Sequence, residues 1–170
     1  PLMRLGYQQA APLRRRADRE ARRLTAASLR DEQIAWLDRV SIPDPERILK
    51  SWPHEVSGGQ RQRIAIAMAL ACGPRLLIAD EPTTALDVST QAEVLDLLDS
   101  LVRDEGLSLL FISHDLPVVS RIADKVLVMR HGRVVEEGPT ARVFTDPQDS
   151  YTQSLVAAAR RLEAALENPA

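Results

Sequence analysis

Two short apolar runs, separated by a stretch with helical periodicity, constrain the fold of this chain more than any other feature. The runs are Leu76–Ala79 and Leu107–Ile112, and the stretch between them covers Ser89–Arg103. Apolar runs of this length are typical of strands that are covered on both faces, and a helical connection joins strands that run in parallel. The sequence therefore predicts an α/β fold in which helices wrap a parallel sheet.

The chain before residue 56 has a different pattern, which predicts a small helical module. We expect an Arg-rich helix at Leu13–Ala27, with Pro12 in its first turn. A second helix should begin at a cap provided by Ser28 or Asp31, and a short helix at Glu46–Ser51 follows it.

Glycine and proline mark most of the other expected boundaries, and Gly106 stops the helix expected at Ser89–Arg103. Gly73–Pro74 ends a helix at Gln60–Cys72 that is nearly all apolar after Arg63, so we expect it to be buried. His131–Gly132 is a hairpin signal, and Pro147 divides the tail into two helices. The remaining predicted elements are the strands Lys125–Met129 and Arg133–Glu137, a short helix at Leu116–Ala123, and a frayed helix or linker at Arg160–Ala170.

Composition and charge restrict the class of protein. With 170 residues, 45% hydrophobic and 27% charged, the chain has a globular composition and a length that suits one domain. Its net charge of −2 gives no reason to expect a nucleic-acid partner. No run approaches the roughly 18 apolar residues of a membrane span, and no signal peptide is recognisable. The one cysteine, Cys72, cannot form an internal disulfide, so we expect a buried, inert thiol in a reducing cytosol.

An acidic pair follows the first apolar run. Asp80 would stand at the carboxyl end of the strand, where ligands of open α/β sheets bind, and could hold Mg²⁺ there directly or through water. Glu81 would be placed to polarise an attacking water. The alternative is a pair of acids that caps a helix at an ordinary strand exit. The pair by itself leaves both interpretations open.

The residues Ser-Gly-Gly-Gln precede the expected buried helix. Ser57 can cap this helix, while Gly58 and Gly59 would let an anion approach the free amides closely. The positive end of the helix dipole also favours a phosphate. Taken alone, however, the four residues that end at Gln60 favour a plain helix cap with a flexible entry.

Two single residues complete the set of candidates. His114 follows the second apolar run and could donate a hydrogen bond to a transferring phosphate, although a lone histidine after a strand is more often structural. Asp87 is expected to be a helix cap or an interface residue. Each signal is weak to moderate by itself, whereas their order and spacing are informative.

In order and spacing, these motifs closely resemble the carboxyl-terminal half of an ABC transporter ATPase. The resemblance covers about residues 40–155 and includes Ser57–Arg63, Asp80–Asp87 and His114. Further segments resemble the branch of importers for oligopeptides, dipeptides and nickel. These segments are Ile42–Arg47, Trp52–Glu55, Ile66–Ala71, Val143–Pro147 and Tyr151–Leu155.

The resemblance implies a P-loop NTPase-like fold and a role for each motif. It assigns residues 1–55 to part of a helical subdomain, 56–145 to the carboxyl-terminal part of the ATPase core, and 146–170 to a helical tail. The roles it implies are the signature motif for Val56–Gln60, the Walker B strand for Leu76–Asp80, the catalytic base for Glu81, the D-loop for Thr84–Asp87 and the switch histidine for His114.

Ligands and partners are implied by the same resemblance. ATP would contact the signature residues and the D-loop aspartate, and Mg²⁺ would be held by Asp80; the nucleotide contacts are Ser57, Gly58, Gly59, Gln60 and Asp87. Two such subunits would form a head-to-tail dimer on integral permease subunits, at the cytoplasmic face of the inner membrane. A periplasmic or extracellular substrate-binding protein would act indirectly. Peptide, nickel and glutathione transport are all compatible with these residues.

One part of the ATPase pattern is absent from these 170 residues. The phosphate-binding loop needs Gly-x-x-x-x-Gly-Lys-Ser/Thr, and neither lysine, Lys50 or Lys125, follows a glycine. We therefore expect the Walker A loop and the Q-loop upstream of Pro1, and Gln8 and Gln9 at the surface. The chain alone is expected to hydrolyse no ATP. The alternative is a catalytically inactive truncated product that acts at most as an interaction module. A non-transport ABC ATPase of DNA repair or translation is disfavoured by the tail pattern.

Overall fold

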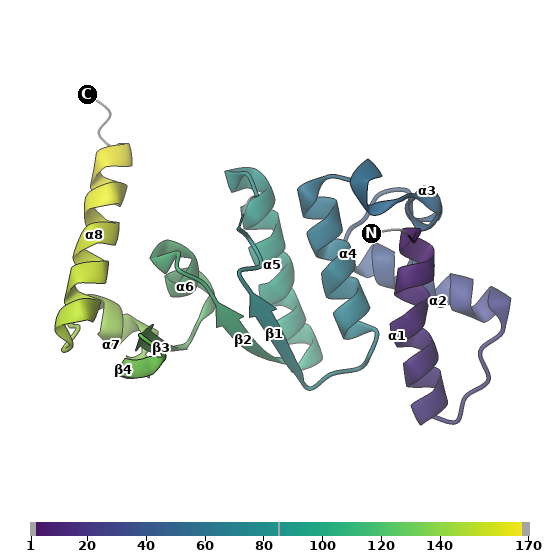
Figure 1. The fold of residues 1–170 in the computed structure, drawn as a ribbon, viewed down its shortest axis with the longest axis horizontal. Helices are drawn as coiled ribbons and strands as arrows, with labels where there is room; N and C mark the ends of the chain where they lie inside the picture. Colours follow the sequence, from purple (N-terminus) through teal and green to yellow (C-terminus); the bar gives the residue numbers. More distant parts are fainter. Residues whose placement is uncertain (1–2, 85, 168–170) are drawn as a thin grey trace. The chain divides into compact units, whose positions relative to one another are not determined.

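The computed structural model describes residues 3–84 and 86–167 (Figure 1). The chain forms two compact units, Pro1–Leu110 and Phe111–Ala170. The first contains α1 to α5 and β1, and the second contains α6, the β3–β4 hairpin, α7 and α8; β2 crosses the boundary. The functional division at residues 55 and 145 stays a prediction, since these units are defined by compactness alone.

The chain before residue 56 is helical, as predicted, but its boundaries differ. Helix α1 covers Leu5–Arg19 and contains Pro12 in its interior, so the predicted helix at 13–27 is wrong at both ends. Leu13 is fully buried in α1, which packs against α2 and α3. Packing of this buried face stabilises the helix despite the hydrogen bond that a proline removes. The other helices of this region are α2 (Ala26–Arg39), α3 (Pro45–Lys50) and the 3₁₀ helix η1 (Pro53–Glu55).

Thr25 caps α2, so the predicted caps Ser28 and Asp31 are wrong. The Thr25 hydroxyl accepts a hydrogen bond from the amide of Ser28 at 3.1 Å, and the Thr25 amide donates to the Ser28 hydroxyl at 2.9 Å. Ser28 is therefore the third residue of the helix, which closes the capping box, and not the cap itself.

Gln9 is buried, which corrects the expectation that it lies at the surface. Its side-chain amide donates to the carbonyl oxygen of Gln33 at 3.1 Å, and the Gln33 amide donates to the carbonyl oxygen of Gly6 at 2.6 Å. Two polar side chains thus join α1 to α2, although the buried side-chain oxygen of Gln9 has no hydrogen-bond partner among the described residues.

Strands β1 (Leu76–Asp80) and β2 (Ser108–Ile112) pair in a two-stranded sheet and run in the same direction (Figure 1). This arrangement confirms the predicted parallel pairing through a helical crossover. The expectation that both faces are covered is wrong for the part of the chain that is described. Four apolar side chains of the two strands are 43–59% exposed because the described elements do not cover them; these are Leu76, Ile78, Leu110 and Ile112.

Helices α4 (Gly58–Leu70) and α5 (Val88–Glu105) lie on either side of β1 in the sequence and contact each other. Gly106 ends α5 in a left-handed conformation with φ +61°, as predicted. α4 also contacts α1 and α2, so it links the helical region to α5. Most of α4 is buried or half-buried, but Ala65 is exposed, so burial is less complete than predicted.

The second unit contains α6 (Leu116–Ile122) and the predicted hairpin. Strands β3 (Lys125–Arg130) and β4 (Arg133–Pro139) are antiparallel, and both residues of the connecting His131–Gly132 turn have positive φ. This turn geometry matches the twist of the strands that it joins. Helices α7 (Thr140–Thr145) and α8 (Ser150–Glu167) lie on either side of Pro147, as predicted.

The buried carboxylate of Glu136 ties β4 to the start of α8. Its oxygens accept hydrogen bonds from the amides of Gln148 at 3.0 Å and Asp149 at 3.1 Å, and Arg142 forms an ion pair with it. The amide of Gln148 is the main cause that holds the pKa of Glu136 below its ordinary value.

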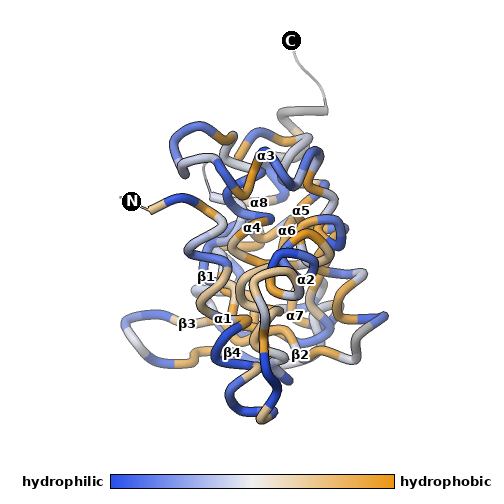
Figure 2. The backbone as a smooth tube through the Cα atoms, turned by 90° about the vertical axis from the view of Figure 1, so that its right-hand side faces the viewer, coloured by the Kyte–Doolittle hydropathy of each residue, from blue (hydrophilic) through white to orange (hydrophobic). Residues whose placement is uncertain are grey.

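Hydrophilic and hydrophobic segments are interspersed along the described chain (Figure 2). Within residues 3–84 and 86–167, no helix is long and apolar enough to cross a membrane. Cys72 is only half-buried, which corrects the expectation of a fully buried thiol.

Candidate functional site

The amino end of α4 is organised by a capping box. The Ser57 hydroxyl accepts a hydrogen bond from the amide of Gln60 at 3.2 Å, and the Gln60 side-chain oxygen accepts one from the amide of Ser57 at 3.1 Å. The predicted cap is therefore confirmed. Because the cap uses the third amide of the helix, the amides of Gly58 and Gly59 remain as the first donors at its positive end.

Gly59 allows α4 to approach α5 closely. A Cβ atom at Gly59 would lie 2.2 Å from Cγ2 of Thr90, and one at Gly58 would lie 3.3 Å from Cδ2 of Leu86. No real side chain tolerates the first of these distances. The sequence suggested that Gly59 leaves backbone amides accessible. The structure adds a second reason for a glycine, because the ends of α4 and α5 pack too closely here for a side chain.

Asp87 caps α5, which confirms one of its two predicted roles. One carboxylate oxygen accepts bonds from the Ser89 hydroxyl at 2.6 Å and the Thr90 amide at 2.9 Å, and the other accepts from the Thr90 hydroxyl at 2.7 Å. These bonds, led by that of Ser89, hold the pKa of Asp87 well below its ordinary value. The carboxylate consequently stays charged at the positive end of α5.

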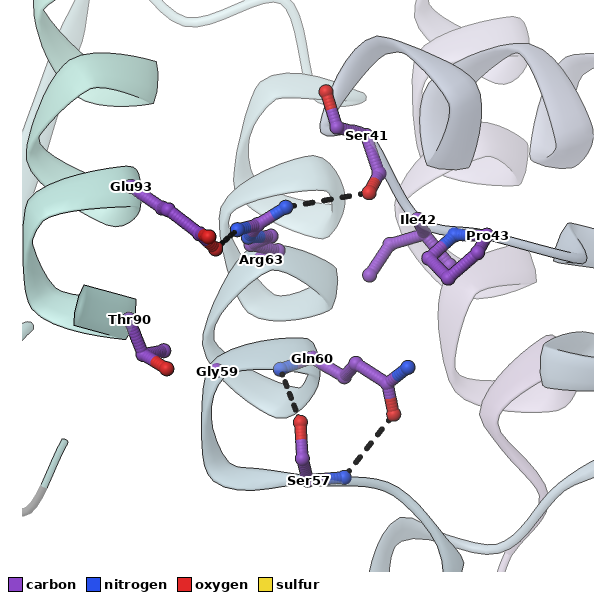
Figure 3. A pocket seen from close by; sticks show the side chains of 9 residues that line it. All are labelled: Ser41, Ile42, Pro43, Ser57, Gly59, Gln60, Arg63, Thr90 and Glu93. Carbon is purple, nitrogen blue, oxygen red and sulfur yellow. Dashed lines mark hydrogen bonds and ion pairs between the residues drawn. The ribbon is translucent and has the colours of Figure 1, made fainter. Parts of the chain in front are cut away.

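A pocket of about 200 Å³ lies beside these helix ends (Figure 3). Arg63 reaches across it from α4, donating to the carbonyl oxygen of Ser41 at 3.3 Å and forming an ion pair with Glu93 of α5. The pocket is lined by Ser41, Ile42, Pro43, Ser57, Gly59, Gln60, Arg63, Thr90 and Glu93. It therefore joins signature residues to the turn after α2 and to the first turns of α5.

Asp80 and Glu81 end β1, as the sequence predicts. Asp80 is exposed and Glu81 is half-buried. The Thr84 hydroxyl donates to the Glu81 carboxylate at 2.6 Å, and the Thr84 amide donates to the Glu81 carbonyl oxygen at 3.2 Å. Glu81 has a φ of +48°, a conformation that is uncommon for residues other than glycine and is found at functional sites.

The described residues contain no group of three or more His, Cys, Asp or Glu side chains that could hold a metal ion. A site for Mg²⁺ at Asp80 would therefore need oxygen ligands from elsewhere. Such a site fits the chemistry of Mg²⁺, which usually takes one or two carboxylates and completes its shell with water and substrate phosphates.

His114 is exposed in the second unit, between β2 and α6. The next residue, Asp115, caps α6 by accepting a hydrogen bond from the amide of Val118 at 3.3 Å. The cap fixes where the chain leaves the strand, immediately beside the histidine. His114 and Glu81 belong to different compact units.

The structure brings the signature residues and Asp87 together through Thr90, which the sequence did not single out. Arg63 and Glu93 were also missed as a pair, since their contact joins residues 30 apart. The sequence signal for this pair was helical spacing, since Arg63 follows Gly59 by four residues and Glu93 follows Thr90 by three. Of the predicted D-loop, Ala85 lies outside the described residues.

Comparisons with known proteins connect this site to one family. A family model described as ABC transporter matches residues 6–84. A protein of Agrobacterium fabrum named peptidoglycan transport ATP-binding protein YejF is 56% identical over 79% of this chain and 25% of its own length. A protein of Brucella melitensis whose name refers to peptide import and ATP binding is 47% identical over 98% of this chain and 48% of its own length.

A glutathione import ATP-binding protein of Pectobacterium atrosepticum is 46% identical over 93% of this chain and 25% of its own length. The chain thus spans about half the length of the Brucella relative and a quarter of the other two. Among solved structures, a dimeric ATP-binding cassette bound to ADP and phosphate has a TM-score of 0.70 at 28% identity. The match covers 82% of this chain and 58% of that chain.

Proposed function

We propose that this chain forms part of the ATP-binding subunit of an importer for peptides or glutathione. The proposal starts from the family of the chain, which is that of the ATP-binding domains of ABC transporters. The names of the relatives support the import of a peptide-like substrate, glutathione being itself a small peptide. They agree with the branch to which the sequence was assigned by resemblance.

One observation carries the proposal: two helix ends meet at the predicted signature motif. Gly59 of α4 lies against Thr90 of α5, and Thr90 binds the capping carboxylate of Asp87. Both helices begin within a few residues of this contact, so two positive helix ends lie together. Free amides and aligned dipoles at such a place favour the binding of a phosphate group.

The catalytic roles follow from the chemistry of the residues. Glu81 would accept a proton from the attacking water, and His114 would donate a hydrogen bond to the transferring phosphate. Asp80 would hold Mg²⁺, which supplies neutralisation of phosphate charge when it is bound. Ser57 and the amides of Gly58 and Gly59 would donate hydrogen bonds to the terminal phosphate of ATP.

The partners belong to the same proposal. The signature end of α4 would face a nucleotide held by a second ATPase subunit in a head-to-tail dimer, and the dimer would bind integral permease subunits. The subunit would then lie at the cytoplasmic face of the inner membrane, and a substrate-binding protein would act through the permease. These 170 residues alone would hydrolyse no ATP, because they contain no phosphate-binding loop.

The test uses the native gene product that contains this chain, purified with its permease subunits. We expect ATP hydrolysis that depends on Mg²⁺, and a Glu81→Gln variant that still binds ATP but has lost turnover. Uptake of labelled dipeptide and of labelled glutathione by cells with and without the gene identifies the substrate. Turnover of the variant equal to that of the wild type would contradict the role of Glu81. Unchanged uptake of both substrates would contradict the proposed import function.

A further inference from the structure

Two contacts, one helical turn apart, join α4 to α5 (Figure 3). In the first, Gly59 lies against Thr90, and in the second, Arg63 forms an ion pair with Glu93. Residues four apart on α4 and three apart on α5 share a face of their helix, so both contacts lie along one interface. Because the earlier residue of one helix meets the earlier residue of the other, the two helices run in the same direction here.

Arg63 has a second partner, which lies outside both helices. Its guanidinium donates to the carbonyl oxygen of Ser41, in the turn between α2 and α3, at 3.3 Å. The side chain of Arg63 is only 16% exposed, whereas that of Glu93 is 61% exposed. A guanidinium carries separate N–H groups in a rigid plane, so one side chain can hold two acceptors at a fixed distance from each other.

We propose that Arg63 is a positioning residue that holds the amino ends of α4 and α5 in register and couples them to the turn at residues 41–43. The proposal rests on the proposed function, since these helix ends are the ones assigned to phosphate. Arg63 lies more than one turn inside α4 and acts through the contact between Gly59 and Thr90. A shift of the 41–43 turn would be transmitted by Arg63 to Ser57 and Asp87.

Arg61 provides a matched control on the same helix. It carries the same charge two positions earlier and is exposed, whereas Arg63 is half-buried in the pocket. Glu93→Gln provides a second variant, which leaves Arg63 unchanged and alters only its exposed partner. This variant is expected to fold even if the substitution of Arg63 prevents folding.

Hydrogen–deuterium exchange of the native gene product tests the coupling directly. In Arg63→Gln we expect the hydrogen-bonded amides near both contacts to exchange about 5–30 times faster than in the wild type, as for the loss of one or two kcal/mol of local stability. These are the amides of Ser41 and Ile42, Ser57 and Gln60, and Thr90 and Gln91. Glu93→Gln should accelerate exchange at Thr90 and Gln91 but not at Ser41 and Ile42. Equal exchange in Arg63→Gln and Arg61→Gln would overturn the proposal.

A charge exchange separates the two contacts of Arg63. The double variant Arg63→Glu with Glu93→Arg restores an ion pair between the helices but no donor to Ser41. We expect exchange at Thr90 and Gln91 to return towards that of the wild type while exchange at Ser41 and Ile42 stays fast. Restoration of both segments, or of neither, would overturn the assignment of two separate contacts to Arg63.

ATP turnover distinguishes positioning by Arg63 from a general effect on stability. We expect Arg63→Gln to lower kcat with a smaller change in the KM for ATP, and Arg61→Gln to change neither. An equal effect of both variants on kcat would count against positioning by Arg63. If the wild type shows no turnover but the exchange pattern is as expected, the proposed function fails while the coupling by Arg63 stands.

Discussion

Gly59 of α4 and Thr90 of α5 approach so closely that a Cβ atom on the glycine would lie 2.2 Å from Cγ2 of the threonine. The Thr90 hydroxyl and amide both donate to Asp87. A packing contact and a helix cap therefore meet at one side chain, which links the signature end of α4 to the start of α5.

Substitution of Gly59 tests this contact. We expect Gly59→Ala to reduce the free energy of unfolding by about 1–3 kcal/mol, because the added methyl group displaces Thr90. Adding Thr90→Ser removes Cγ2 but keeps the hydroxyl, so the double variant should recover the lost stability. Thermal and denaturant unfolding measure both effects. A Gly59→Ala variant that is as stable as the wild type would show that the two helices separate at no cost.

The cap of α4 can be compared with the cap of α2. Ser57→Ala and Thr25→Ala each remove the hydroxyl of a capping box, and each should lower the free energy of unfolding by about 0.5–2 kcal/mol. In the native gene product, only Ser57→Ala should also weaken ATP hydrolysis, because only Ser57 is assigned to phosphate. Equal loss of hydrolysis in both variants would indicate an effect of stability alone.

The charge of Asp87 predicts a dependence of stability on pH. Its folded-state pKa lies below the ordinary value of 3.8, so its contribution is present above that value and is lost as the pH falls through the lower, folded-state pKa. Asp87→Asn keeps a good helix cap but cannot titrate. Unfolding measured from pH 5 downwards should therefore show a smaller acid-induced loss of stability in the variant. Identical pH profiles would contradict the shifted pKa.

The core of the helical region is tested at Leu37 of α2. This side chain is fully buried, so Leu37→Ala should cost about 2–5 kcal/mol in the free energy of unfolding. Leu127 of β3 is 52% exposed, and Leu127→Ala should change the stability far less. Denaturant midpoints of the two variants provide the comparison. Similar losses in both would contradict the described burial of α2.

Local sequence patterns correctly predicted the features that depend only on neighbouring residues. The hairpin at His131–Gly132, the end of α5 at Gly106 and the capping of α4 by Ser57 are all confirmed. The start of α1 could not be predicted in this way, because Pro12 is a local signal for a helix start that burial of Leu13 overrides. The cap of α2 was misassigned because several residues with capping side chains stand close together in the sequence.

The sequence by itself determined the family, because the order and spacing of its motifs can be read without any knowledge of packing. It also determined the α/β alternation, because apolar periodicity is a property of neighbouring residues. Tertiary structure alone decided that Thr90 meets Gly59 and that Arg63 joins Glu93 to Ser41. These contacts connect residues 22 to 31 positions apart. They depend on how two helices and a turn pack together, and no pattern within one element specifies that arrangement.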